Sequence, residues 1–301
     1  MSTAALPLAK LLRPIADSLV YLQSTKVHPT WFPFALAPTI HATRISIAYQ
    51  AKVAGRPLSW PTYLAGYLIM CWGGTTLTHL LLSLPPPPFH SAQLYINYLT
   101  PHILLTILFS LNPNLLSPQL LDTFFFPLDA LVRTTAITAG LNLLNNPSVN
   151  PAFVASPLTH LIIGAVASAG GGLAAATLST WNQEWSFSTP PVLRRGVGLW
   201  GSVDVWGGAL VALVYGMSTS HPAFSGFQNS LSSYGLAAFA PGAGTFVLSP
   251  LGARALGATV LIVLFGLRVY NVHWRSASPA VAPPRTPGMG DRSRAKKSRL
   301  Q

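Results

Sequence analysis

The chain has 301 residues, of which 50% are hydrophobic and only 8% are charged. Soluble domains carry about 25% charged residues, so this composition excludes an ordinary water-soluble domain and predicts an integral membrane protein. The net charge is +12, and the single cysteine, Cys71, excludes a disulfide framework within one chain.

Residues 1–30 are expected to form a separate N-terminal segment. Lys10 and Arg13 lie in the middle of MSTAALPLAKLLRPIADSLV, where a cleavable signal peptide would have its apolar core. A short helix at the membrane surface fits this pattern better.

Seven apolar stretches between residues 31 and 272 predict an all-α, polytopic transmembrane domain. A spanning helix needs about 20 mostly apolar residues. The expected spans are 31–50, 60–83, 93–111, 119–144, 153–179, 196–217 and 251–272. The segment 232–248 is apolar but broken by Gly and Pro. It predicts a lumenal or re-entrant loop, with an eighth span as the alternative.

Basic residues are unevenly distributed between the expected loops. Loops 51–59 and 180–195 contain Lys or Arg, and seven of the eighteen basic residues lie between Arg275 and Arg299. Residues 273–301 are rich in Pro, Ser and charge, which predicts a disordered tail. With seven spans, the positive-inside rule predicts a cytosolic C-terminus and a lumenal N-terminus. Because the tail has no interleaved aromatic residues, we expect it to attract anionic lipids rather than nucleic acid.

Two groups of three spans repeat the same features. The first and fourth spans each carry an arginine, Arg44 and Arg133. The second and fifth spans each contain adjacent glycines. These are Gly73 and Gly74 in the second span, and Gly170, Gly171 and Gly172 in the fifth. Because three is odd, the two groups would face opposite ways, which predicts two inverted three-helix repeats with a seventh helix outside them. Such repeats place a binding or permeation site at their interface.

The glycine runs need a physical reason, because an interior glycine costs a helix about 1 kcal/mol relative to alanine. One reason is close helix packing in lipid. The other is a kink or unwound turn that turns carbonyls toward a water-filled path. Thr75 and Thr76 follow the first glycine run. Their hydroxyls could replace part of a cation's hydration shell or bond back to their own helix.

Ionisable residues inside spans are expensive and usually face protein or water. They are Arg44, Asp122, Asp129, Arg133, Asp204 and Arg268. Asp129 and Arg133 are four residues apart and are expected to pair, either as a structural ion pair or as a cation attractor and a gate. We expect Asp204 to pair with Arg44 or to line the path, and Arg268 to extend to lipid headgroups.

The sequence contains no HExxH, CxxC, Walker or GxSxG motif. His41, His79, His102 and His160 lie on different spans, and their spacing does not indicate a metal site. We therefore expect no enzyme, no cofactor and no metal. His79 follows the first glycine run and would either titrate in the path or be a satisfied interior histidine. A lipid-acting enzyme that uses His41, His79 or Asp204 is a further alternative.

Several stretches resemble the trimeric intracellular cation channels, the TRIC family of reticulum membranes. They are CWGGTTLTHLLLSLPPPPF, PLDALVRTTAITAGLN, IIGAVASAGGGLAAATLSTWNQEW and VGLWGSVDVWGG, which are similar to the second, fourth, fifth and sixth helices of that family. Their order and spacing extend the resemblance over residues 30–272.

This resemblance implies a seven-span homotrimer with one pore per subunit, lined by the second and fifth spans, which kink at glycines. It implies a channel for monovalent cations, chiefly potassium, that supplies counter-ions during calcium release. The chain departs from animal members, whose fourth helix carries Lys-Glu-Val at a phosphoinositide site, because it has Asp129, Ala130 and Leu131 there. Only Arg133 keeps a basic charge, which argues against lipid regulation of that kind. A secondary transporter built on the same repeat is the alternative function.

Overall fold

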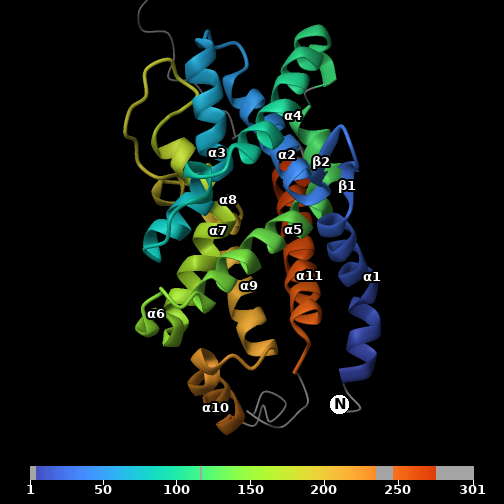
Figure 1. The fold of residues 1–301 in the computed structure, drawn as a ribbon, viewed down its shortest axis with the longest axis vertical. Helices are drawn as coiled ribbons and strands as arrows, with labels where there is room; N and C mark the ends of the chain where they lie inside the picture. Colours follow the sequence, from blue (N-terminus) through green and yellow to red (C-terminus); the bar gives the residue numbers. More distant parts are fainter. Residues whose placement is uncertain (1–4, 116, 235–246, 276–301) are drawn as a thin grey trace, which may run out of the picture.

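Helices dominate the chain in this computed structural model, which describes residues 5–115, 117–234 and 247–275 (Figure 1). The expected all-α class is confirmed, apart from one antiparallel hairpin of strands β1 (Lys26–His28) and β2 (Phe32–Ala35). The helices are α1 (Ala5–Ser24), α2 (Leu36–Val53), α3 (Trp60–Leu81), α4 (Ala92–Leu111), α5 (Pro118–Asn142), α6 (Pro151–Ala155), α7 (Pro157–Thr177), α8 (Gly198–Gly201), α9 (Val203–Ser218), α10 (Ser225–Ser233) and α11 (Pro250–Val269). The expected loop at 232–248 lies mostly outside the described residues, as does the expected tail beyond residue 275.

Four helices, α4, α5, α7 and α11, are long and apolar enough to cross a membrane. Helix α9 is apolar but has only 16 residues. Helices α2 and α3 occupy the other two expected spans but are not among those four. This is the pattern of a multi-pass membrane protein, and the number of seven spans stays a prediction.

Three expected spans begin later than the sequence predicts. The fifth, expected from residue 153, is divided into α6 and α7 at Ser156. The first is helical only from Leu36, because residues 32–35 belong to the hairpin. The sixth is divided into α8 and α9 at Ser202. Gly196 and Gly198, at the start of that span, have φ values of +82° and +62°. Only glycine adopts this left-handed conformation at little cost, so a continuous helix cannot start before them.

Helix starts are fixed by local sequence. The hydroxyl oxygens of Ser156 and Ser249 accept hydrogen bonds from the backbone N–H groups of Thr159 and Gly252, at the starts of α7 and α11. Proline follows each of these serines, where it presets the helical φ and removes an N–H that would have no partner. The Ser-Pro pairs therefore mark helix starts that the sequence alone reveals.

Helices α3 and α7 meet at their glycines. A Cβ placed on Gly73 would lie 3.0 Å from the Cα of Gly171, and a Cβ on Gly170 would lie 2.7 Å from the Cα of Gly74. Both helices continue through these residues without an unwound turn. The close packing proposed for the glycines is therefore the role that the structure shows.

Helix α7 has a second glycine contact, with α9. A Cβ on Gly164 would lie 2.6 Å from the carbonyl oxygen of Gly208, so side chains at these positions would force the helices apart. Helix α7 is thus held between α3 and α9 by backbone contacts on two sides.

Helix α1 lies beside α11 (Figure 1). Leu12 and Leu19 of α1 are buried in a cluster with alanines of α11, while Lys10 and Arg13 are exposed. One face of α1 is therefore buried and another exposed. The place of residues 1–30 at a membrane surface stays a prediction.

The replacement Gly164→Ala should destabilise the protein, because the added methyl group would collide with the carbonyl of Gly208. Overpacking of this kind costs about 1–3 kcal/mol, which thermal unfolding in detergent would detect as a lower midpoint. Gly172→Ala is the matched control on the same helix, because a Cβ there meets nothing within 4 Å. Equal shifts in the two variants would contradict the packing role of Gly164.

Candidate functional site

A cavity of about 400 Å³ lies among α2, α3, α5, α7, α9 and α11, and the loop that follows α7 also lines it. Both polar and apolar groups form its wall. Its charged lining residues are Arg44, Lys52, Asp129, Arg133, Arg194, Asp204 and Arg268. The cavity collects charged residues that are far apart in the sequence, which makes it the candidate functional site.

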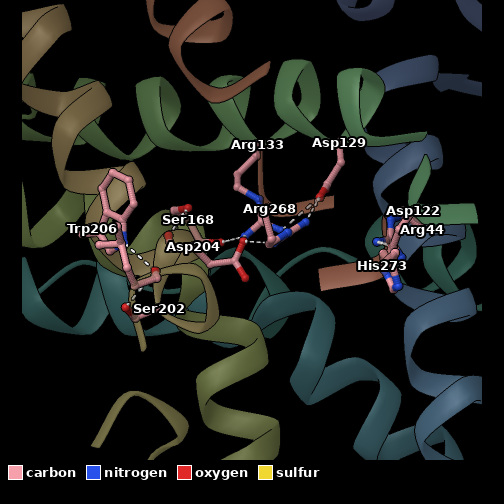
Figure 2. Close-up of polar contacts among 11 residues, drawn as sticks. Arg44, Asp122, Asp129, Arg133, Ser168, Ser202, Asp204, Trp206, Arg268 and His273 are labelled. Atoms are coloured by element: carbon pink, nitrogen blue, oxygen red, sulfur yellow. Dashed lines mark hydrogen bonds and ion pairs between the residues drawn. The ribbon is translucent and has the colours of Figure 1, made fainter. Parts of the chain in front are cut away.

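One wall of the cavity is a cluster of two arginines and two aspartates (Figure 2). Arg133 on α5 lies 3.4 Å from Asp129 on the same helix and 3.3 Å from Asp204 on α9. Arg268 on α11 lies 2.9 Å from Asp204 and 4.0 Å from Asp129. Each guanidinium therefore contacts both carboxylates, and the cluster joins three helices.

The surroundings of this cluster hold the guanidinium groups in place. The Phe265 ring centroid is 5.1 Å from the Cζ of Arg133 and 4.5 Å from the Cζ of Arg268, within the range of cation–π attraction. Arg133 also donates to the backbone carbonyl of Ser168, whose hydroxyl donates to the backbone carbonyl of Asp204 at 2.6 Å. Asp204 lies in the first turn of α9, where the helix dipole favours a negative charge.

A second charged cluster lies beside the first (Figure 2). Arg44 of α2 pairs with Asp122 of α5. The other carboxylate oxygen of Asp122 lies 3.1 Å from Nε2 of His273. His273 belongs to a π-helical turn, Tyr270–Trp274, that continues α11. This cluster joins the middle of α2 and the π-helical turn after α11 to the start of α5.

The three arginines of these clusters face three carboxylates, and all six side chains are at most about a third exposed. Charges removed from water must be paired, because an unpaired one costs several kcal/mol. The inner network is therefore electrically balanced.

The opposite end of the cavity is basic. Lys52 lies eight residues after Arg44 on α2, about 12 Å along the helix axis. Its ammonium group lies 5.6 Å from the centroid of the Trp181 ring, and Arg194 donates to the carbonyls of Thr189 and Ala176. Within the described residues, no carboxylate pairs with Lys52 or Arg194. This end therefore carries unneutralised positive charge.

Asp129 and Arg133 pair as expected. Of the two alternatives expected for Asp204, pairing with Arg44 is wrong, because Asp204 pairs with Arg133 and Arg268 while it lines the cavity. Arg268 does not extend to headgroups, because the pairing with Asp204 draws it inward. His273 was missed by the sequence analysis, since nothing local marks its contact with Asp122.

The glycines and threonines of the expected pore divide into two groups. Gly74, Thr75, Gly171 and Gly172 line the cavity, and Gly172 is exposed within it. All of these glycines except Gly172 lie in the α3–α7 contact, and Gly73 and Gly170 lie there without lining the cavity.

Thr76 and His79 are not among the described residues that line the cavity. His79 contacts the Thr75 carbonyl through Nδ1 at 2.8 Å, so it is a partly exposed histidine that bonds to its own helix. The described residues also contain no group of three or more His, Cys, Asp or Glu that could hold a metal ion.

No protein-family model, curated protein or solved structure matches this chain. The resemblance to the TRIC family therefore rests on the sequence motifs alone.

The pairing of Arg44 with Asp122 should be measurable by a double-mutant cycle of Arg44→Met and Asp122→Leu. Because the pair is largely shielded from water, we expect a coupling energy of about 1–3 kcal/mol in the free energy of unfolding. The control is Arg13–Asp17 on α1, whose side chains are 80% and 71% exposed. An exposed pair of this spacing should couple by less than about 0.5 kcal/mol. Similar coupling in both cycles would contradict the structural role of the Arg44 pair.

Proposed function

We propose that the protein is a channel for monovalent cations, potassium among them, in the endoplasmic reticulum or nuclear membrane. It would act as a homotrimer with a lumenal N-terminus and a cytosolic C-terminus, and would supply counter-ion flow during calcium release. The observation that carries this proposal is the charged cavity enclosed by helices of both predicted repeats.

The arrangement of helices around the cavity supports the predicted inverted repeats. Helices α2, α3 and α4 would form one repeat and α5, α7 and α9 the other. Arg44 on the first helix of one repeat and Arg133 on the first helix of the other both line the cavity. Helices α3 and α7, the second of each repeat, meet at their glycine runs. A site at such an interface is the usual arrangement in transport proteins with inverted repeats.

The glycine contact limits where a permeation path could run. Because α3 and α7 are closely packed at Gly73 and Gly170, an ion would pass beside this contact rather than through it. Thr75 and Gly172 are exposed in the cavity wall on that side. The Thr75 hydroxyl and the carboxylate of Asp204, which line the same cavity, are oxygen ligands of the kind that replace water around a cation.

A secondary transporter is the second candidate. Lys52 and Arg194 carry positive charges that no described carboxylate pairs with, which favours an anionic occupant at that end of the cavity. Anionic lipids are a related class of partner, and the basic residues beyond residue 275 would support their attraction.

Recording the purified protein in a planar bilayer under asymmetric KCl tests the proposal. A cation channel should give unitary currents whose reversal potential lies near the potassium equilibrium potential. A transporter should instead give saturable flux without unitary steps. Unitary currents that reverse near the chloride equilibrium potential, or no transport at all, would contradict the proposed cation channel.

The replacement Gly172→Leu should lower or abolish the unitary conductance, because it places a bulky side chain in the cavity where a Cβ meets nothing within 4 Å. Gly171 is unsuitable for this test, since a Cβ there would overlap the carbonyl of Met70 and disturb packing. Gly226→Leu on α10 is the control, because that site is equally open but outside the cavity lining. Unchanged conductance in the Gly172 variant would place the path elsewhere.

A further inference from the structure

We infer that α11, the helix outside the two predicted repeats, sets the ion selectivity of the cavity through Arg268. This inference rests on the proposed channel function and names the residue that determines its specificity. Arg268 would be a positioning and neutralising group, whose guanidinium cancels negative charge on the cavity wall.

The geometry makes Arg268 the closer partner of the more accessible carboxylate. Asp204 has a side chain that is 36% exposed, whereas that of Asp129 is 9% exposed. Nη1 of Arg268 lies 2.9 Å from Oδ1 of Asp204, and the nearest nitrogen of Arg133 lies 3.3 Å from the same oxygen. The more accessible carboxylate therefore has Arg268 of α11 as its closest basic partner.

The charge balance of the cluster depends on this one side chain. Arg133 and Arg268 together cancel Asp129 and Asp204, and each of the four lines the cavity. Removal of the Arg268 charge would leave one net negative charge on this wall. Arg133 is also bound to the Ser168 carbonyl and to Asp129, which ties it to α7 and α5 and leaves it less able to replace Arg268.

A net negative charge beside a permeating ion favours cations over anions. With the screening of water, one negative charge about 6 Å from the ion should raise the ratio of potassium to chloride permeability by about three- to tenfold. The intact cluster has no net charge and should by itself favour neither cations nor anions.

The test measures reversal potentials of the full-length protein in bilayers under a KCl gradient. Arg268→Gln removes the charge but keeps a hydrogen-bonding side chain, and should shift the reversal potential further toward potassium. The double variant Arg268→Gln with Asp204→Asn restores charge balance and should return the ratio to the wild-type value. Arg254→Gln is the control on the same helix, because Arg254 bonds to Gln23 and Thr135 outside the cavity.

The double variant separates charge from structure, since a merely structural role for Arg268 predicts no rescue by Asp204→Asn. An unchanged ratio in Arg268→Gln, or a double variant that shifts as far as the single one, would overturn the inference while the channel function stands. No transport by the wild type would overturn the proposed function itself. If Arg268→Gln does not fold, Asp204→Asn alone should lower the cation preference, and an unchanged ratio there would also overturn the inference.

Discussion

Pairing of charge inside an apolar helix bundle is the constraint on which the rest of this structure depends. Helix α5 carries two of the three carboxylates, Asp122 and Asp129, seven residues apart and so two turns apart on one face. Helices α2 and α11 approach that face with basic side chains, and α9 adds Asp204. Helices α2, α9 and α11 are therefore fixed on α5 by electrostatics as well as by apolar burial. This arrangement keeps polar groups at the centre of a chain that is 50% hydrophobic.

Close packing and the cavity are achieved by different residues of the same helix. The faces of α7 that carry Gly164 and Gly170 are closed by α9 and α3, whereas Gly172 faces open space. A run of small residues can thus bring two backbones together and still leave a gap beside them. The sealed contact gives the bundle rigidity, and the open position leaves room for an occupant.

Sequence predicted those features that depend on neighbouring residues. Apolar length located most of the helices, and the four-residue spacing of Asp129 and Arg133 predicted their pairing. Ion pairs between residues that are far apart in the chain could not be predicted from the sequence. The sequence contains several carboxylates that could pair with Arg44, and the packing of α2 on α5 brings Asp122 into contact with it. The hairpin before α2 was missed because its second strand, Phe32–Ala35, is continuous with the apolar run that predicted the first span.

The π-helical turn at the end of α11 adjusts the register of one helix to that of another. Arg268 and His273 are five residues apart, which in a regular α-helix would point them about 140° away from each other. The wider turn at Tyr270–Trp274 reduces that divergence, so both side chains reach carboxylates on α5. The additional residue in this turn therefore aligns the side chains of Arg268 and His273 with the two-turn spacing of Asp129 and Asp122 on α5. Loss of one residue from this turn ahead of His273 would rotate that side chain around the helix axis by about 100° and so turn it away from Asp122.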